Sequence, residues 1–230
     1  MIVLLQVHDG HLLAKRFFNS ANALSYDSIV KLATFGQDFV WKKKILDIAG
    51  NQGSVLDLAC GTGILSCMLA ARSRSITGID LTIDYLRLAK KKKSDLFLAN
   101  GTAELLPYRS GCFDAVVSSY LAKYIDTGMV VQECWRVLRP NGVVVFHDFT
   151  YPCGIVGSMW RIYFYILKLA GTFVRSWQAV FDGLDKLVLR TQWVKQTISA
   201  LKSAGFENIK HTSLTGGTSA IVSAVKPSRS

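Results

Sequence analysis

The residues with the clearest chemical character lie in the stretch 55–63, Val-Leu-Asp-Leu-Ala-Cys-Gly-Thr-Gly, where an apolar run with an acidic residue continues into a glycine turn. Gly61 and Gly63 permit tight backbone geometry and let a ligand approach the main chain. In place of the third glycine of a dinucleotide-binding fingerprint, the chain has Ser66. Asp57 precedes the glycines, which suits a ligand that carries positive charge and no pyrophosphate.

Two further groups follow the next predicted strands. Asp80 stands at the end of residues 75–80, where a side-chain acceptor can hold the two hydroxyls of a ribose. Residues 101–104, Gly-Thr-Ala-Glu, offer backbone groups and a short polar side chain to the edge of an adenine ring. A strand-end Asp is often only a helix cap, and Gly-x-Gly is often only a turn. Together and in this order, however, the three groups predict a site for S-adenosylmethionine.

Short apolar runs alternate with helical stretches up to about residue 148. The predicted strands are residues 54–58, 75–80, 95–99, 113–118 and 143–147. Helices are predicted at 65–72 and 129–138, and a further helix is predicted to follow the second strand and to end at residue 93. Strands that alternate with helices indicate a parallel sheet covered on both faces, and near-continuous apolar strands agree with that burial. Ligands in such sheets bind beyond the carboxyl ends of the strands, where the groups above are expected to lie.

The pattern changes after Asp148. Residues 151–189 are predicted to be helical, residues 197–204 form another helix, and residues 206–211 and 220–225 form two closing strands joined by Gly216-Gly217. The prediction is one α/β domain over residues 1–230. It comprises an N-terminal helical segment (1–50), a cofactor-binding core (51–150), a helical insertion (151–195) and a closing helix with strands (196–226).

Several motifs outside the glycine turn share the spacing of one protein family. They are Tyr26-Asp27, Leu32-x-Thr34-Phe35-Gly36, Trp41-Lys42, residues 103–108 with Phe113-Asp114, residues 136–142 (Arg-Val-Leu-Arg-Pro-x-Gly), Ala204-Gly205-Phe206 and residues 214–217 (Leu-Thr-Gly-Gly). On these motifs the chain resembles the class I S-adenosylmethionine-dependent methyltransferases, and more narrowly the C-methyltransferases of ubiquinone and menaquinone biosynthesis, over roughly residues 26–225.

The resemblance implies a Rossmann-like, mostly parallel sheet of seven strands, with a helical insertion between the fifth and sixth. It also implies cofactor contacts at Thr62, Asp80, Thr102, Ala103 and Ser119. The patterns described above add Asp57, Gly61 and Gly63 to this set. The activity it implies is C-methylation of a prenylated quinol of the demethylmenaquinol or ubiquinol-precursor type.

The chain departs from the family pattern where the acceptor is expected. The family has Gly-Leu-Arg-Asn after the fourth strand, whereas this chain has Leu-Ala-Lys-Tyr at 121–124, so Lys123 keeps the charge but loses the planar fork of Arg. Val30 replaces an Asn, and residues 182–187 lack the Tyr residues of a family segment. Another small apolar or phenolic acceptor, or a non-catalytic cofactor-binding module, therefore stays open as an alternative.

Three residues near the expected acceptor are candidates for catalysis. Lys123 could stabilise a phenolate, and Asp148 and His147, at the end of the fifth predicted strand, could accept protons. A solvent-facing Lys123 and a capping Asp148 are the structural alternatives. The aromatic residues around Trp160 could line an apolar acceptor pocket, although such spacing is also typical of core packing.

Composition narrows the remaining classes. The chain has 230 residues, half of them hydrophobic, and its 27 Lys and Arg against 16 Asp and Glu give a net charge of +11. The five cysteines are scattered without a CxxC pair, so we expect neither a disulfide scaffold nor a metal site, and we expect a reducing cytoplasm. Nucleic acid is not expected as a partner, because residues 118–120 (Ser-Ser-Tyr) lack the proline-rich segment of base-amino methyltransferases.

Charge and hydropathy together suggest contact with an anionic membrane surface. Residues 1–7 lack the positive flank of a secretory signal, and residues 155–174 contain Arg161 and Lys168. Each charge near a bilayer centre costs roughly 2.5–3.5 kcal/mol, so this segment is predicted to be an interfacial or pocket-covering helix. The lysine run 90–93 either caps a helix or attracts lipid. A homodimer also stays open.

Overall fold

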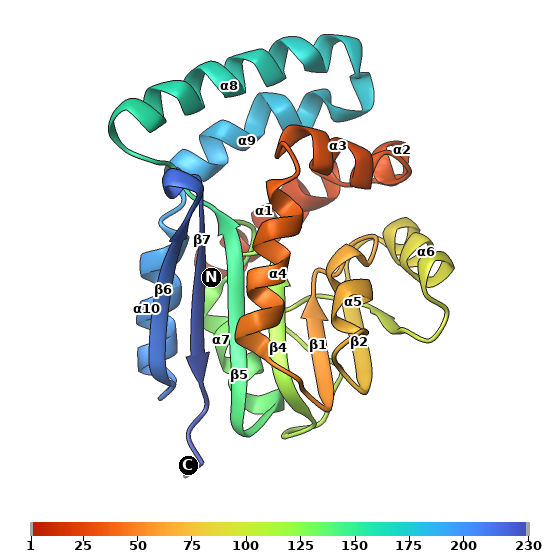
Figure 1. The fold of residues 1–230 in the computed structure, drawn as a ribbon, viewed down its shortest axis with the longest axis vertical. Coiled ribbons are helices and arrows are strands. Elements are labelled where there is room, and N and C mark those ends of the chain that lie inside the picture. The colour runs from red at the N-terminus through yellow and green to blue at the C-terminus, as the bar shows by residue number, and fades with distance from the viewer. Residues whose placement is uncertain (1, 229–230) are drawn as a thin grey trace.

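The computed structural model describes the backbone of residues 2–228 and the side chains of residues 10–228. Seven strands form one sheet in the order β3-β2-β1-β4-β5-β7-β6 (Figure 1). Their bounds are β1 (Ser54–Leu58), β2 (Ser75–Asp80), β3 (Phe97–Asn100), β4 (Phe113–Ser119), β5 (Leu138–Phe149), β6 (Glu207–Leu214) and β7 (Ser219–Val225). The first five strands are parallel, and β7 runs antiparallel to both β5 and β6. The predicted seven-stranded, mostly parallel sheet is confirmed.

Helices occur in each part of the chain that was predicted to be helical, with shifted ends. Their bounds are α1 (Ile2–Phe17), α2 (Ser20–Ala23), α3 (Tyr26–Ala33), α4 (Gln37–Ala49), α5 (Ile64–Leu69), α6 (Ile83–Lys92), α7 (Thr127–Val137), α8 (Gly154–Phe173), α9 (Gln178–Arg190) and α10 (Trp193–Ser203). The predicted helix over 151–189 is in fact α8 and α9, which are separated by a short 3-10 turn at Arg175–Trp177. This helical insertion lies between β5 and the last two strands, as expected.

Two predicted boundaries are wrong for identifiable reasons. The third strand starts at Phe97 and not at Asp95, because the pairing with β2 begins at Thr77 opposite Phe97. Pro140-Asn141-Gly142 does not separate α7 from β5 but lies inside β5, because Leu138 already pairs with Phe113. The register then shifts, and Val143 pairs with Ala115.

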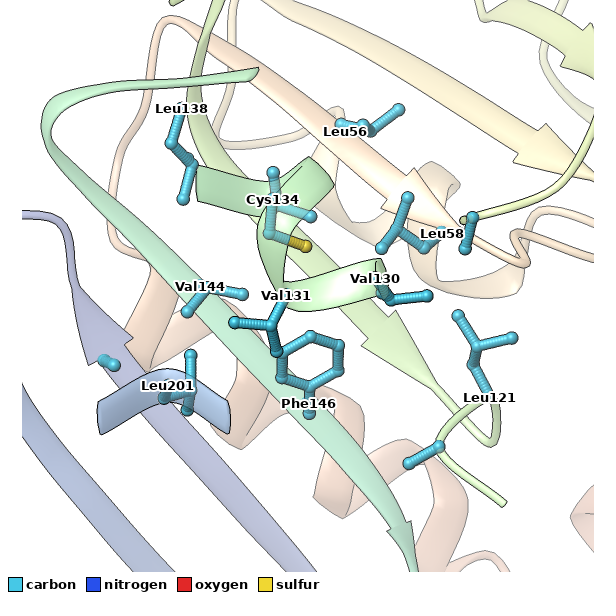
Figure 2. Packing of buried hydrophobic residues seen from close by; sticks show 14 of the residues in the cluster. Leu56, Leu58, Leu121, Val130, Val131, Cys134, Leu138, Val144, Phe146 and Leu201 are labelled. Carbon is cyan, nitrogen blue, oxygen red and sulfur yellow. The ribbon is translucent and has the colours of Figure 1, made fainter. Parts of the chain in front are cut away.

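The two faces of the sheet bury separate hydrophobic clusters, which explains why the central strands β1, β4 and β5 carry apolar residues on both faces. Val55 and Val117 pack on one face with residues of α4 and α5, such as Ile45 and Leu69. Leu56 and Leu58 point to the opposite face. There they meet Val130, Val131 and Cys134 of α7, Phe146 of β5 and Leu201 of α10 (Figure 2). Neighbouring residues of β1 therefore pack into clusters on opposite faces of the sheet, because side chains alternate along a strand.

A third cluster closes the carboxyl end of the sheet. Phe17 of α1 and Tyr124, which follows β4, pack with Trp177, Val180 and Phe181 of the insertion. Helices α1, α3, α8 and α9 therefore gather over the ends of the strands, whereas α4 lies along a face of the sheet (Figure 1). Among the described residues, no helix is both long enough and apolar enough to cross a membrane.

Candidate active site

The glycine turn connects β1 to α5 at the carboxyl end of the sheet. Gly61 and Gly63 have φ values of +57° and +79°, which L side chains rarely adopt. A Cβ on Gly63 would lie 2.9 Å from the Cβ of Ala89, so this glycine lets α5 pack against α6. The backbone N–H of Gly61 donates to Asp80 Oδ2 at 2.9 Å. The turn is therefore fixed by the same carboxylate that was predicted to hold a ribose.

Asp80 is held in place by backbone donors. Its Oδ1 accepts from the Thr82 N–H at 2.8 Å, while its Oδ2 accepts from Gly61. Burial raises the pKa of Asp80, and these two hydrogen bonds oppose the rise. Each carboxylate oxygen can accept a further hydrogen bond. The geometry leaves that capacity facing the cavity that Asp80 lines.

Asp57 is buried in β1, four residues before Gly61. The Ser66 hydroxyl donates to its Oδ2 at 2.6 Å. Burial raises the pKa of Asp57 to about 7, while the Ser66 hydrogen bond and the charge of Lys42 act in the opposite direction. Ser66, which from sequence counted only as a missing glycine, is therefore the residue that fixes this carboxyl group.

Thr62 is oriented by a residue from the N-terminal segment. Its hydroxyl donates to Asp27 Oδ1 of α3 at 2.5 Å, and the other oxygen of Asp27 contacts Lys92 of α6. The glycine turn is thereby tied to α3. Asp27 belongs to the Tyr-Asp motif, so the structure explains why that motif and the turn occur together.

Three adjoining cavities lie over the carboxyl ends of the strands. The first contains Asp80, Gly101, Ala103 and Ser119 and is covered by α1. The second lies between α3, α8 and α9 and is lined almost wholly by aromatic and aliphatic side chains, with an empty volume of about 610 Å³ including its mouth. The third contains Asp57, Gly61 and Thr62. Tyr26 and Tyr120 line all three cavities, so they stand where the three meet.

Not every predicted contact lines a cavity. Thr102 is only half-buried and lines none of the three, whereas its neighbours Gly101 and Ala103 line the first. Gly63 also lines none, in keeping with its packing role against Ala89. The remaining predicted cofactor residues are brought together in the first and third cavities.

Lys123, which lines the second cavity, forms a buried ion pair with Asp148. Lys123 Nζ donates to Asp148 Oδ1 at 2.6 Å and to the carbonyl of Tyr120 at 3.0 Å. The ammonium also lies 4.8 Å from the ring centroid of Tyr124 and 5.5 Å from that of Tyr120. Burial lowers the pKa of Lys123 and raises that of Asp148, each against the attraction of the other. Lys123 is thus not solvent-facing.

His147 is placed differently from its prediction as a proton acceptor. It is fully buried and lines none of the three cavities. Its Nδ1 lies 2.9 Å from the Ser119 hydroxyl and its Nε2 lies 2.8 Å from the Ser219 hydroxyl. Ser219 donates its own proton to the Asp148 carbonyl, so Nε2–H is the donor and Nδ1 accepts from Ser119. Burial holds the pKa of His147 well below its usual value, and both ring nitrogens are engaged. The prediction for His147 is therefore corrected: it orients Ser119 and has no nitrogen left for a substrate.

Two site residues were missed by the sequence analysis. Lys42 of α4 is buried, contacts Asp38 and lines the third cavity opposite Asp57. The Tyr120 hydroxyl donates to Asp38 at 2.8 Å. Glu104 lines the first cavity, where one oxygen meets His11 at 3.0 Å and the other, Oε1, has no partner within the described part of the chain. Lys42 and Glu104 both lie in motifs that the chain shares with the family, and these motifs could have identified them as site residues.

The donor set fits S-adenosylmethionine. The first cavity offers the acceptor capacity of Asp80 for hydroxyls and the unpartnered Glu104 Oε1 for a donor. The third cavity offers a carboxyl group, Asp57, for an ammonium and an amine, Lys42, for a carboxylate. A seven-stranded class I sheet with this set of groups at its carboxyl edge defines an S-adenosylmethionine-dependent methyltransferase.

Comparison with known proteins gives the family. The profile of the ubiE/COQ5 methyltransferase family matches residues 7–226, and the chain belongs to this family. It is 28% identical to the demethylmenaquinone methyltransferase of Oceanobacillus iheyensis over 218 residues, which is 89% of this chain and 91% of that protein. The enzyme of the same name from Staphylococcus aureus is 27% identical and covers 85% of this chain and 86% of its own.

Solved structures support the fold. A methyltransferase from Thermotoga maritima superposes with a TM-score of 0.67 at 15% identity, covering 89% of this chain and 96% of its own. The geranyl diphosphate C-methyltransferase of Streptomyces coelicolor gives a TM-score of 0.59 at 13% identity, covering 81% of this chain and 75% of its own. The predicted fold, cofactor and enzyme class are confirmed.

The raised pKa of Asp57 predicts that the binding of S-adenosylhomocysteine, the product of the cofactor, depends on pH. Between the usual Asp pKa and about 7 the folded protein holds a proton on this carboxyl group. An ammonium in the third cavity favours the carboxylate, so binding expels that proton, and affinity for S-adenosylhomocysteine should rise as the pH increases through about 7. Titration calorimetry at several pH values measures this.

Two controls isolate the effect. 5′-Methylthioadenosine lacks the amino-acid part, so its affinity should stay flat across the same pH range. Asp57→Asn should remove the pH dependence for S-adenosylhomocysteine, because the amide does not titrate. A flat profile for the wild-type protein would contradict the assignment of Asp57 to the ammonium.

Proposed function

We propose that this methyltransferase transfers the methyl group to a ring carbon of a prenylated quinol, of the demethylmenaquinol or ubiquinol-precursor type. One observation carries the proposal: an apolar cavity, lined by Trp160, Tyr163 and Leu167, also contains Lys123, whose ammonium lies 5.5 Å from the ring of Tyr120, where the three cavities meet. Such a cavity suits a ring with a hydrocarbon tail and one acidic hydroxyl. The curated relatives named demethylmenaquinone methyltransferases support the same acceptor class.

In the proposed reaction Lys123 passes one of its protons to Asp148 and takes the phenol proton, so that an ammonium stays beside the phenolate and Asp148 becomes a neutral carboxylic acid. S-adenosylmethionine, when bound, supplies an electrophilic methyl group on a sulfonium. The phenolate makes the ring carbon nucleophilic, and Tyr26 and Tyr120 hold the ring in line at the junction of the cavities. The ring carbon then loses its hydrogen as a proton to water, the phenolate regains a proton from Lys123, and Asp148 returns its proton to Lys123.

For the cofactor we propose that Asp80 binds the ribose hydroxyls and that Ala103 and Ser119 contact the nucleoside end. In the third cavity Asp57 faces the ammonium and Lys42 the carboxylate of the methionine part, beside Gly61 and Thr62. Thr102 and Gly63 act through the backbone that they shape. Asp27, through its bond to Thr62, holds this turn in position.

A second acceptor class, a small phenol without a long tail, is favoured by one feature. Lys123 presents a single point charge, whereas the Arg expected from the family could grip two oxygens. Val30, which stands in place of an Asn of the family pattern, lines the same cavity. A ring with one hydroxyl near the ammonium meets this site as well as a quinol does.

We also propose that the enzyme works on the cytoplasmic side of an anionic membrane. The net charge of +11 supports attraction to such a surface, and five unpaired cysteines suit a reducing compartment. We also keep a homodimer as an alternative to a monomeric enzyme.

A labelled-methyl assay tests the acceptor. The purified protein is incubated with methyl-labelled S-adenosylmethionine and demethylmenaquinol, and the lipid extract is separated. We expect label in menaquinol, and none when menaquinol itself, whose ring carbon is already methylated, is the acceptor. Label in a short phenol but not in the quinol would favour the second acceptor class, and no label in either would overturn the proposal.

A further inference from the structure

Helix α8 is apolar on two opposite faces. Its inner face carries the buried Gly157, Phe164 and Gly171 and packs against α9, with Phe164 reaching the second cavity. Helix α8 forms the outermost layer over that end of the molecule (Figure 1). A helix with two apolar faces is normally covered by protein or lipid on both, whereas the protein covers only one face of α8.

The outer face repeats with helical spacing of four and three residues. It consists of Ile155, Met159, Ile162, Ile166, Leu169 and Phe173, whose exposed fractions run from 49% to 89%. We call this set the α8 outer face. Gly157, Phe164 and Gly171 share one side of the helix because they are seven positions apart. With 3.6 residues per turn, the α8 outer face lies about half a turn away, on the opposite side. Six large apolar side chains in one row exceed the scattered exposure of an ordinary surface.

The apolar surface continues onto the N-terminal segment. The ring of Phe35 lies 5.9 Å from that of Tyr163, and the Tyr163 hydroxyl donates to the carbonyl of Ala33 at the end of α3. Phe35 and Leu32 are themselves largely exposed. Two elements that are far apart in sequence, and that both line the second cavity, thus present apolar side chains to the outside together.

The charges around this face have one sign. Residues 154–173 contain no Asp or Glu, while Arg161 is exposed on α8 and Arg175 follows its end. Lys31 is exposed on α3, one turn before Phe35. Lys168 is paired with Asp185 at 2.6 Å and adds no net charge. The lysine run 90–93 does not belong to this surface, because it ends α6, which lies away from α8 (Figure 1). Three of its four lysines also have partners, since Lys90 donates to the Leu96 carbonyl and Lys92 and Lys93 contact Asp27 and Asp95.

We propose that the α8 outer face docks on the surface of an anionic lipid bilayer, with Arg161, Arg175 and Lys31 at the headgroups. Charge selects this occupant over a second copy of the chain: two copies would bring like charges together along the seam, whereas anionic headgroups complement them. The inference rests on the proposed function for its purpose, since docking here puts the second cavity, which α8 covers, beside the phase that holds a lipid acceptor.

Vesicle flotation without any acceptor tests the docking. Vesicles of phosphatidylcholine alone are compared with vesicles that also contain phosphatidylglycerol, using the wild-type protein and Ile162→Asp/Ile166→Asp. We expect the wild-type protein to float only with the anionic vesicles, and less so in high salt. The double variant should bind more than about tenfold more weakly, because two charged side chains replace buried hydrocarbon. Phe97→Asp, an equally exposed apolar position on the edge strand β3, should bind like wild type.

Three further measurements keep the outcomes distinct. Binding of S-adenosylhomocysteine, unchanged in all variants, shows that the fold is intact. Equal vesicle binding by the double variant and the wild-type protein, or no binding by either, would overturn the proposal. A dimer in size-exclusion chromatography that the double variant converts to a monomer would assign the face to a second copy instead. Turnover of a tail-less quinol in the absence of vesicles tests the proposed function separately, because it does not require docking.

Discussion

Asp80→Ala is expected to weaken the binding of S-adenosylhomocysteine by about 100-fold or more. Two ribose hydroxyls that donate to one carboxylate contribute roughly 1.5–3 kcal/mol each, and both interactions would be lost. The substitution also removes the acceptor for the N–H groups of Gly61 and Thr82, which fix the glycine turn. Calorimetric titration of the variant measures the loss directly.

A neighbouring carboxylate provides the control for this prediction. Asp84, in the first turn of α6, is paired with Arg87 at the surface and lines none of the three cavities, so Asp84→Ala should bind S-adenosylhomocysteine like wild type. A thermal unfolding midpoint in the absence of ligand separates loss of the turn from loss of the ribose contacts. If Asp80→Ala binds within about threefold of wild type, the ribose lies elsewhere and the site assignment fails.

The residues around the glycine turn show what a sequence can and cannot supply. The strand, the turn and both acidic residues follow from local pattern, because backbone geometry and strand ends are encoded within a few positions. The bond from Thr62 to Asp27 is not encoded in this way, since it joins residues 35 positions apart through the placement of α3. The family resemblance implied a ligand role for Thr62, and nothing in the local pattern pointed to Asp27 as its protein partner.

His147 shows the same limit from the other side. Its position at the end of β5 made it a plausible proton acceptor. The antiparallel strand β7 pairs with β5, placing Ser219 opposite Phe149 and within reach of the imidazole. Sequence pattern predicts that β7 exists, but the hydroxyl that meets His147 depends on strand order and register. Lys42 was overlooked for a similar reason, because only packing shows that a lysine of α4 faces the third cavity and not water.

Lys123→Met is expected to lower kcat by about 100-fold or more while leaving the affinity for S-adenosylhomocysteine within about twofold of wild type. Removing one preorganised donor from a developing oxyanion typically costs 10²–10³ in rate, and an ammonium beside a phenolate plays the same part. Lys123 lines the second cavity but neither of the other two, so binding of the cofactor product should not change. The initial rate with a quinol acceptor and a parallel calorimetric titration make the comparison.

The buried pair requires a further variant, because loss of one partner leaves Asp148 unpaired and breaking a buried pair costs roughly 3–5 kcal/mol of stability. Lys123→Met/Asp148→Asn removes both charges, so it should recover stability without recovering rate. Lys195→Met, the same change at an exposed position on α10, should match wild type in both. A rate near wild type in a folded Lys123→Met would show that the phenolate forms without this ammonium. Partial rescue by Lys123→Arg would show instead that the charge in this cavity is what the reaction requires, since Arg keeps the cation and changes only its shape.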